Sequence, residues 1–201
     1  FYFTNTDRKH LKNSPQLEVF NEKNIPVLLL SDPIDEFWIQ NINKYENKEF
    51  KSITKGKVDL SKYEDEKNKK VVKENKNISK INDLINVLKN ELKDKISDVI
   101  ISSRLSRSPI IMIAEESSMD INMEKIMKMH NKEIQDSKKI LEINPKHPMI
   151  IKISELLTSN NHKILSNLLL DQANILDGNI LSDPTNYMEN LTEIFVKTKE
   201  N

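Results

Sequence analysis

The chain contains no cysteine among its 201 residues. This absence excludes disulfide bonds, thiolate nucleophiles and zinc sites built from cysteine. It also fits a protein that works in a reducing compartment. Candidate chemistry therefore has to come from other side chains, chiefly carboxylates and histidines.

Glycine is almost as scarce, because Gly56 and Gly178 are the only two in the chain. A loop that cradles phosphate needs glycines where backbone N–H groups approach the ligand. Neither a G-x-G-x-x-G pattern nor a Walker A pattern can be drawn here. Nucleotide binding by these devices is excluded within these residues, and we expect no cofactor in them.

Net charge and long apolar runs are missing as well. Lys plus Arg and Asp plus Glu number 31 each, and the only arginines are Arg8, Arg104 and Arg107. Without a basic or aromatic stacking face, nucleic-acid binding is disfavoured. No apolar run approaches the roughly 20 residues that span a bilayer, and no signal peptide is visible. We therefore expect neither nucleic acid nor a membrane as partner.

The first 55 residues predict a small α/β layer. Phe1–Asn5 is typical of a strand, Ser14-Pro15 of a helix start, and the apolar run 25–30 of a strand buried on both faces. Strand, helix and strand in this order favour a parallel βαβ unit. Because the chain starts in strand-like residues without methionine, we interpret it as a fragment of a longer protein.

Two further elements are expected in this layer. Asp32 and Pro33 predict an N-cap and first residue of a helix that continues through Phe37 and Trp38. Lys48–Thr54 predicts an edge strand. Residues 56–77 are rich in Lys and Glu and predict a charged linker or solvated helix.

Residues 78–201 predict a second, α+β domain. An amphipathic helix carries Ile81, Leu84 and Leu88. Strands are predicted at 99–101 and 110–114 as a hairpin, and at 140–143. His147-Pro148 predicts the start of a helix that follows the third strand.

The last forty residues predict two antiparallel helices joined by a short turn. Asn161 is expected to cap the first and Gly178 to close it, and Asp183-Pro184 opens the second. Their apolar surface exceeds what one neighbouring layer covers, so two copies are expected to form an intersubunit four-helix bundle. In the alternative, both helices pack only on their own domain. The predicted dimer interface consists of Leu165, Leu168, Leu169, Gln172, Leu176, Tyr187, Leu191, Ile194 and Phe195.

A methionine-rich segment precedes the third strand. Four of the seven methionines lie within residues 119–129. Met119, Met123, Ile126 and Met127 share one helical face, and Glu124 and Lys128 pair at i, i+4 on another. Such a stripe is often part of a core. If the helix projects from the sheet, however, flexible and polarizable methionines suit a surface that accepts many apolar partners.

A hydrolase or metal enzyme is an alternative from another class. Its candidates are the acids Asp32, Asp35 and Glu36, or the histidines His10, His130, His147 and His162. No two histidines have ligand spacing, and no nucleophile–base motif is present. Acids at a helix N-terminus also offset the helix dipole. We therefore expect no catalytic and no metal site, and the fragment itself to be no enzyme.

Several segments together resemble a known family. They are R-L-S-R-S-P at 104–109, N-M-E-K-I-M-K at 122–128, L-E-I-N-P-K-H-P at 141–148 and L-L-L-D-Q-A at 168–173. Upstream, S-P at 14–15, V-L-L-L at 27–30 and S-D-P-I-D-E-F at 31–37 match in the same order. These segments resemble the end of the middle domain and the C-terminal domain of the ninety-kilodalton heat-shock chaperone family.

The resemblance implies a fragment of an ATP-driven, homodimeric chaperone that assists protein folding. Residues 1–55 would end the middle domain, and 78–201 would form the C-terminal dimerisation domain. The family binds ATP and magnesium in parts that lie upstream. Its partners are a second copy, unfolded or partly folded clients and co-chaperones. A structural scaffold without a client site is the alternative.

The resemblance also implies client-contacting positions. They are Glu36 and Phe37 on the middle-domain side, with Trp38 as the competing ring, and Met119, Met123, Ile126 and Met127 on the methionine helix. The chain ends without an acidic M-E-E-V-D-like or a K-D-E-L-like tail. If Asn201 is the natural end, this resembles bacterial or organellar forms, so the cytoplasm, a mitochondrion or a plastid is the expected location.

Overall fold

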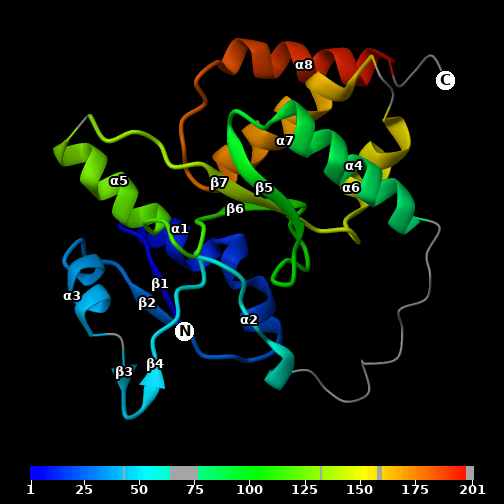
Figure 1. The fold of residues 1–201 in the computed structure, drawn as a ribbon. Coiled ribbons are helices and arrows are strands. Elements are labelled where there is room, and N and C mark those ends of the chain that lie inside the picture. The colour runs from blue at the N-terminus through cyan, green and yellow to red at the C-terminus, as the bar shows by residue number, and fades with distance from the viewer. Residues whose placement is uncertain (43, 64–76, 132, 158–159, 198–201) are drawn as a thin grey trace.

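The structure is a computed structural model that describes residues 1–42, 44–63, 77–131, 133–157 and 160–197 (Figure 1). Helices are mixed with small sheets, which confirms the predicted α+β class. The strands are β1 Tyr2–Thr4, β2 Leu28–Leu30, β3 Lys44–Tyr45, β4 Lys48–Glu49, β5 Ile96–Ile101, β6 Ile110–Ile113 and β7 Lys139–Ile143. The helices are α1 Arg8–Asn13, α2 Glu18–Glu22, α3 Asp35–Asn41, α4 Asn77–Glu91, α5 Ile121–His130, α6 Pro148–Leu156, α7 His162–Leu176 and α8 Pro184–Lys197, with 3-10 turns at Pro15–Leu17 and Ser61–Tyr63.

The first residues form the predicted βαβ unit. β1 and β2 pair in parallel, with Tyr2 opposite Leu28. The Asp7 carboxylate accepts the backbone N–H of Lys9 at 2.8 Å and so caps α1. Because β1 and β2 are parallel, the chain needs the intervening helices to return to the same end of the sheet.

Two local predictions in this layer are wrong. β2 is not buried on both faces, since Leu28 is 50% exposed and Leu29 41% exposed. An apolar run shows only that the residues are hydrophobic, whereas their burial depends on which layers of the fold cover the strand. Asp32 does not cap α3: the helix begins at Asp35, whose carboxylate accepts the N–H of Asp32 at 3.0 Å.

The predicted edge strand at 48–54 is replaced by shorter pieces. β3 and β4 form a two-residue hairpin, in which Lys44 faces Glu49. Further on, Ser52 forms a single parallel bridge with Tyr2. The chain leaves the hairpin and joins β1 for one residue only, too short for a continuous strand.

The second sheet has the order β5-β7-β6. β7 is parallel to β5 and antiparallel to β6. The predicted hairpin between the strands at 99–101 and 110–114 is therefore wrong, because β7 lies between them. Leu141 and Ile143 of β7 share one face of the strand and are fully buried in the core on that side, while Glu142 between them is also buried and pairs with Arg104.

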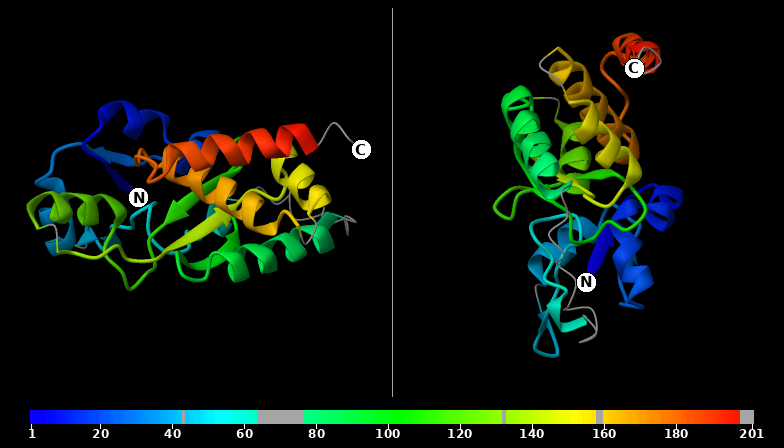
Figure 2. Two further views of the ribbon diagram at one scale, coloured as in Figure 1. Left: turned by 90° about the horizontal axis from the view of Figure 1, so that it is seen from above. Right: turned by 90° about the vertical axis from the view of Figure 1, so that its right-hand side faces the viewer.

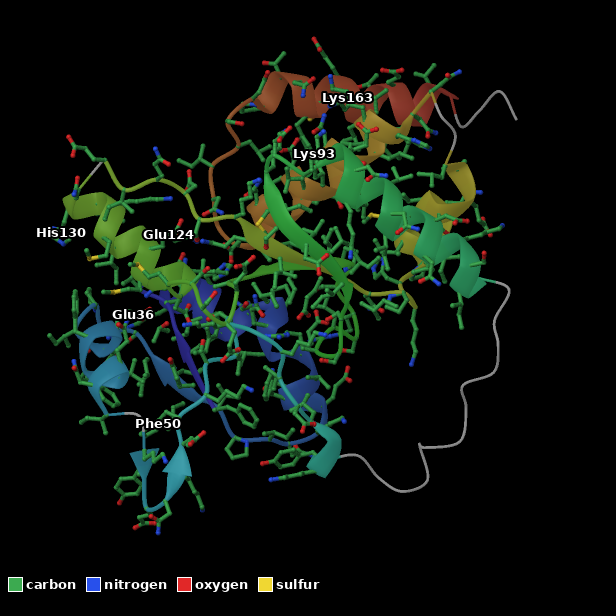
Figure 3. The ribbon with its side chains drawn as sticks, viewed as in Figure 1. Glu36, Phe50, Lys93, Glu124, His130 and Lys163 are labelled. Carbon is green, nitrogen blue, oxygen red and sulfur yellow. The ribbon has the colours of Figure 1, made fainter. Side chains whose placement is uncertain are left out.

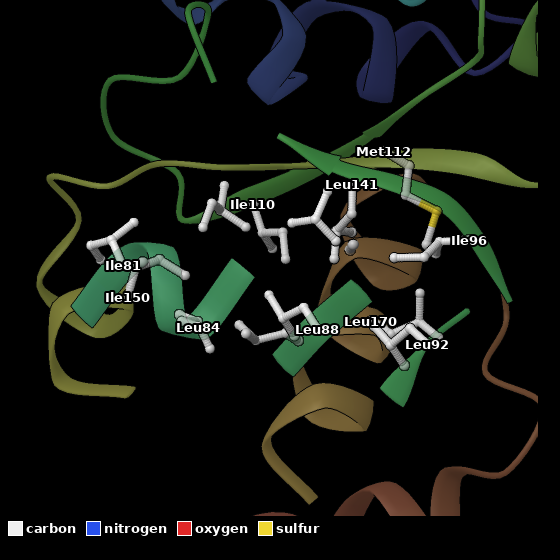
Figure 4. Close-up of a cluster of buried hydrophobic side chains, with 14 residues drawn as sticks. Ile81, Leu84, Leu88, Leu92, Ile96, Ile110, Met112, Leu141, Ile150 and Leu170 are labelled. Carbon is white, nitrogen blue, oxygen red and sulfur yellow. The ribbon is translucent and has the colours of Figure 1, made fainter. Parts of the chain in front are cut away.

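One face of this sheet is covered by α4, α6 and α7 (Figures 1 and 2). Figure 4 shows the core between them. It contains Ile81, Leu84, Leu88, Leu92, Ile96, Val99, Ile110, Met112, Leu141, Ile143, Ile150, Leu169, Leu170 and Ala173. The other face of the sheet lies toward residues 1–60, which have a separate core around Phe3, Phe20 and Ile53.

Buried polar contacts join the two cores. Arg104 is completely buried, forms an ion pair with Glu142 at 3.0 Å and donates to the carbonyls of Ile53 and Gly56. Glu18 accepts the backbone N–H groups of residues 106–108 at 2.8–3.0 Å. Charged groups leave water only when such partners replace their hydration, so these contacts fix how the two parts meet.

The predicted linker at 56–77 begins inside the first core, since Val58 and Leu60 are buried there. Gly56 has φ of +58°, which a glycine adopts without strain, and its N–H donates to the carbonyl of Ala114 at 2.9 Å. Most of the remaining linker, residues 64–76, lies outside the described residues. The domain boundaries at 55 and 78 stay predictions.

The terminal helices α7 and α8 run in opposite directions, as predicted, with α8 outermost on α7 (Figures 1 and 2). Gly178, with φ of +75°, follows the end of α7. The Asp183 carboxylate accepts the N–H of Asn186 at 2.9 Å, and Pro184 is the first residue of α8.

Candidate functional site

The predicted dimer interface divides into buried and accessible residues. Leu165, Leu168 and Leu169 are buried within the single chain, and Leu169 belongs to the core beneath α7. These three side chains already pack within the subunit and leave almost no surface for a second copy, and their assignment to an intersubunit contact stays a prediction. They are buried because α7 covers β6 and α4 with the face that carries them. An acidic residue at 169 would disrupt the subunit before any dimer.

The accessible residues lie chiefly on α8. Tyr187, Leu191 and Ile194 are half-buried, as are Gln172 and Leu176 of α7, whereas Phe195 is 66% exposed. Two exposed apolar residues of α8 were missing from the prediction, namely Met188 and Val196. Met188 lies two helical turns before Phe195 on the same face, and Val196 follows Phe195 in the chain, a signal that was present in the sequence. We call Met188, Phe195 and Val196 the α8 surface.

The methionine helix is only partly open. Met123 and Ile126 are buried, at 8% and 6% exposure, while Met127 is half-buried and Met119 is 39% exposed. Met123 and Ile126 thus take the core alternative for the methionine stripe, and their role in client binding stays a prediction. Figure 1 shows that the C-terminal end of α5 extends away from the sheet, and there Met129 is 80% exposed.

The start of α5 is held to the first part of the chain by buried polar groups. Asp120 accepts the hydroxyls of Ser52 at 2.5 Å and Thr54 at 2.8 Å. The Asn122 amide donates to Glu36 of α3 at 2.7 Å. Figure 3 shows Glu36 below α5, at the side of α3 that faces this helix. These contacts explain why the first turn of α5 is buried.

Glu36 does not face solvent, since it is 1% exposed. Burial raises its pKa, with smaller contributions from the nearby carboxylates of Asp120 and Asp35, while its hydrogen bond from Asn122 opposes the rise. Burial, together with Asp120 and Glu36, also raises the pKa of Tyr2 to about 12. In this structure Glu36 is a structural contact between α3 and α5.

The two neighbouring rings behave differently. Trp38 is half-buried, donates its indole N–H to Asp35 at 2.8 Å and packs edge-on against Phe50. Phe37 is 41% exposed. Phe37 is therefore the ring that remains accessible. We give the name α3–α5 surface to the accessible residues Phe37 of α3, Met119 just before α5 and Met127 of α5, two helices that are joined by the contact between Glu36 and Asn122.

A cluster of charges lies on the opposite side of α5. Glu124 accepts from Lys128 at 2.8 Å, as its i, i+4 spacing predicts, and also from Lys139 and Ser137. Burial opposes ionisation, yet these donors lower the pKa of Glu124 to about 2. Lys125 contacts Asp177 at the end of α7. Burial raises the pKa of the Asp177 carboxyl above its ordinary value, although Lys125 opposes part of this rise. Local sequence patterns do not predict the contact between Lys125 and Asp177, because 52 residues separate them in the chain.

Three of the candidates for catalysis make structural contacts. Asp35 and Glu36 hold the contacts described above, and the His147 ring accepts the N–H of Met149 at 3.2 Å to cap α6. Within the described ranges, no three His, Asp or Glu residues gather as metal ligands. No described helix combines the length and the apolar character needed to cross a membrane.

Comparison with known proteins places the chain in a family. The family model described as Hsp90 protein matches residues 1–200. Chaperone protein HtpG of Roseobacter denitrificans is 39% identical over 201 residues, which cover 96% of this chain and 32% of that protein. HtpG of Legionella pneumophila strain Lens is 32% identical over 198 residues, covering 98% of the chain and 31% of the relative. HtpG of Ruthia magnifica is 37% identical over 194 residues, covering 96% and 30%.

The chain thus spans about a third of the length of these curated relatives. The family match extends over nearly every residue, and it includes all the described elements. The chain therefore belongs to the Hsp90 protein family and is of its bacterial type.

Proposed function

We propose that this chain supplies the dimerisation and client-binding part of a molecular chaperone. The observation that carries the proposal is the α8 surface, an apolar strip on the outermost helix of a chain that already has its own cores. We assign the ATP and magnesium expected from the family resemblance to parts of the longer protein outside these residues.

A second copy is the occupant proposed for the α8 surface. In α8, Tyr187, Leu191 and Ile194 are half-buried, whereas Met188, Phe195 and Val196 are exposed. Covering these three in each of two subunits represents on the order of 5–10 kcal/mol as an upper bound. Two antiparallel pairs related by a two-fold axis make a four-helix bundle, in which each strip meets its own copy.

The α3–α5 surface is proposed to bind clients. Phe37 offers a ring, and Met119 and Met127 offer flexible thioethers that adapt to different apolar side chains. The surface combines residues from the two halves of the chain, which the contact between Glu36 and Asn122 brings together. A client therefore meets a composite surface that neither half forms alone.

Light scattering at tens of micromolar tests the dimer. The expected mass is twice the 23.5 kDa of one chain. Met188→Glu combined with Phe195→Glu should give the monomer mass without loss of helical signal. Ile101→Glu, which changes a half-exposed residue of β5, serves as the matched control and should leave the dimer intact. A monomeric parent chain would refute the proposed dimer.

Client binding is tested by measuring how strongly the chain suppresses the aggregation of a heat-unfolded test enzyme. Phe37→Ser combined with Met119→Ser should weaken suppression severalfold while the chain stays folded and dimeric. Tyr45→Ser, at a more exposed ring outside this surface, should change little. A parent chain that dimerises but does not slow aggregation would support the scaffold alternative.

A further inference from the structure

Lys125 of α5 contacts the very end of α7. Its ammonium group donates to the backbone carbonyl of Asp177 at 2.7 Å and lies 3.5 Å from the Asp177 carboxylate. Asp177 is the residue at which α7 ends. The last carbonyls of a helix lack partners within the helix, and a cation there also interacts favourably with the helix dipole. Lys125 therefore completes a helix that belongs to another part of the fold.

This contact bridges an open space. A pocket of about 470 Å³ lies between α5 and the connection from α7 to α8, where Asn179, Ile180 and Ser182 form part of its lining. The ion pair crosses between the two walls at Asp177. Residues 178–183 connect Asp177 to the start of α8. Because Lys125 holds Asp177, it also helps to fix where this connection begins.

The other face of α5 gives a reason for the helix to move. Met123 and Ile126 lie on the same face as Met119 but are buried. A client segment that extends from the α3–α5 surface to the buried Met123 and Ile126 has to displace α5, which also breaks the contact between Asn122 and Glu36. Lys125 follows Met123 by two residues, so such a displacement draws its ammonium group away from Asp177.

We propose that Lys125 couples client binding at α5 to dimerisation through α8, by capping α7 only while α5 is seated. The inference rests on the proposed function of the two surfaces. When a client lifts α5, the end of α7 loses its cap, the connection to α8 loosens, and the dimer weakens. Because such coupling is reciprocal, dimerisation weakens client binding by the same factor.

Dimer dissociation measured with and without an unfolded probe tests the coupling. Lys93→Cys introduces one labelling position on a chain that lacks cysteine, and energy transfer between two labelled populations then reports the dimer. The probe is reduced, carboxymethylated lactalbumin, which cannot refold. The dissociation constant of the otherwise unchanged dimer should rise about tenfold at saturating probe, within the usual range of coupling between sites.

The variants distinguish the contact between Lys125 and Asp177 from general effects of charge. Lys125→Met should still dimerise and bind the probe, but the rise should fall below twofold. Asp177→Asn keeps the carbonyl acceptor and should give an intermediate rise, which provides a milder variant if Lys125→Met folds poorly. Lys128→Met removes a neighbouring lysine that contacts Glu124 and should retain the tenfold rise.

The outcomes are distinguishable. A parent chain that dimerises and binds the probe without a rise overturns the coupling and leaves the proposed function standing. A tenfold rise retained in Lys125→Met, or lost equally in Lys128→Met, also overturns it. Failure of the parent chain to dimerise or to bind the probe overturns the proposed function, and the coupling with it.

Discussion

Glu124 illustrates what a single residue contributes to this fold. Two lysines and a serine hydroxyl donate to one carboxylate, although they come from α5, β7 and the segment between them. The sequence predicts only the pair with Lys128, because that pair lies on one helix. Lys139 and Ser137 reach Glu124 through the tertiary fold, and they strengthen the charged form further.

Glu124→Gln should lower stability by about 1–2 kcal/mol at neutral pH, the lower end for charged hydrogen bonds because water screens part of the cluster. The folded pKa of about 2 lies below the ordinary value of 4.5. The stabilisation is therefore complete above about pH 4.5 and is lost as the pH falls through 2. Thermal melts of both proteins between pH 7 and 2 should converge at the acid end.

Glu133→Gln is the matched control, since Glu133 follows α5 and is exposed. Its melting temperature should stay close to that of the parent chain at every pH. A Glu124→Gln difference that persists unchanged down to pH 2 would contradict the ionic explanation.

At the scale of elements, α8 is defined mainly by its own sequence. Asp183 and Pro184 predict its start, and the structure confirms it with the hydrogen bond from Asn186 to Asp183. Strand pairing behaves differently. The pattern at 99–101 and 110–114 predicts the two strands, but the hairpin expected between them is wrong, because β7 from later in the chain pairs with both.

Asp183→Ala should destabilise the first turn of α8 by about 1 kcal/mol, since the N–H of Asn186 loses its acceptor. Because α8 packs at the edge of the molecule, amide exchange should accelerate chiefly in residues 184–190. Glu189→Ala removes a carboxylate farther along the same helix and should alter exchange less. Equal acceleration in α4 and α7 would show that the change is global and not a lost cap.

At the scale of the whole molecule, the proposed dimer follows from the apolar residues that α8 leaves exposed. The chain folds around two cores and still leaves Met188, Phe195 and Val196 in water. A partner that binds only the folded state stabilises it by mass action. Stability should then depend on protein concentration, which it does not in a monomer.

A hundredfold increase in protein concentration should raise the melting temperature by about 3 °C. Mass action then stabilises each dimer by about 2.7 kcal/mol, and dividing this free energy by the unfolding entropy of two chains gives the shift. Differential scanning calorimetry across that range checks it. Met188→Glu combined with Phe195→Glu should remove the dependence. A melting temperature of the parent chain that is independent of concentration would contradict dimeric unfolding.

The sequence by itself determined the start of α8, the parallel βαβ unit, the α+β class and the family, because these depend on local residue types and on their order; the caps expected at Asp32 and Asn161 do not form through their side chains. Only the tertiary structure decided which apolar residues are accessible. Leu169 and Phe195 have the same apolar character, yet α7 turns Leu169 into the core while α8 leaves Phe195 exposed. Likewise, Met123 is buried and Met129 is not. Burial depends on what packs against a face, and that partner comes from distant parts of the chain.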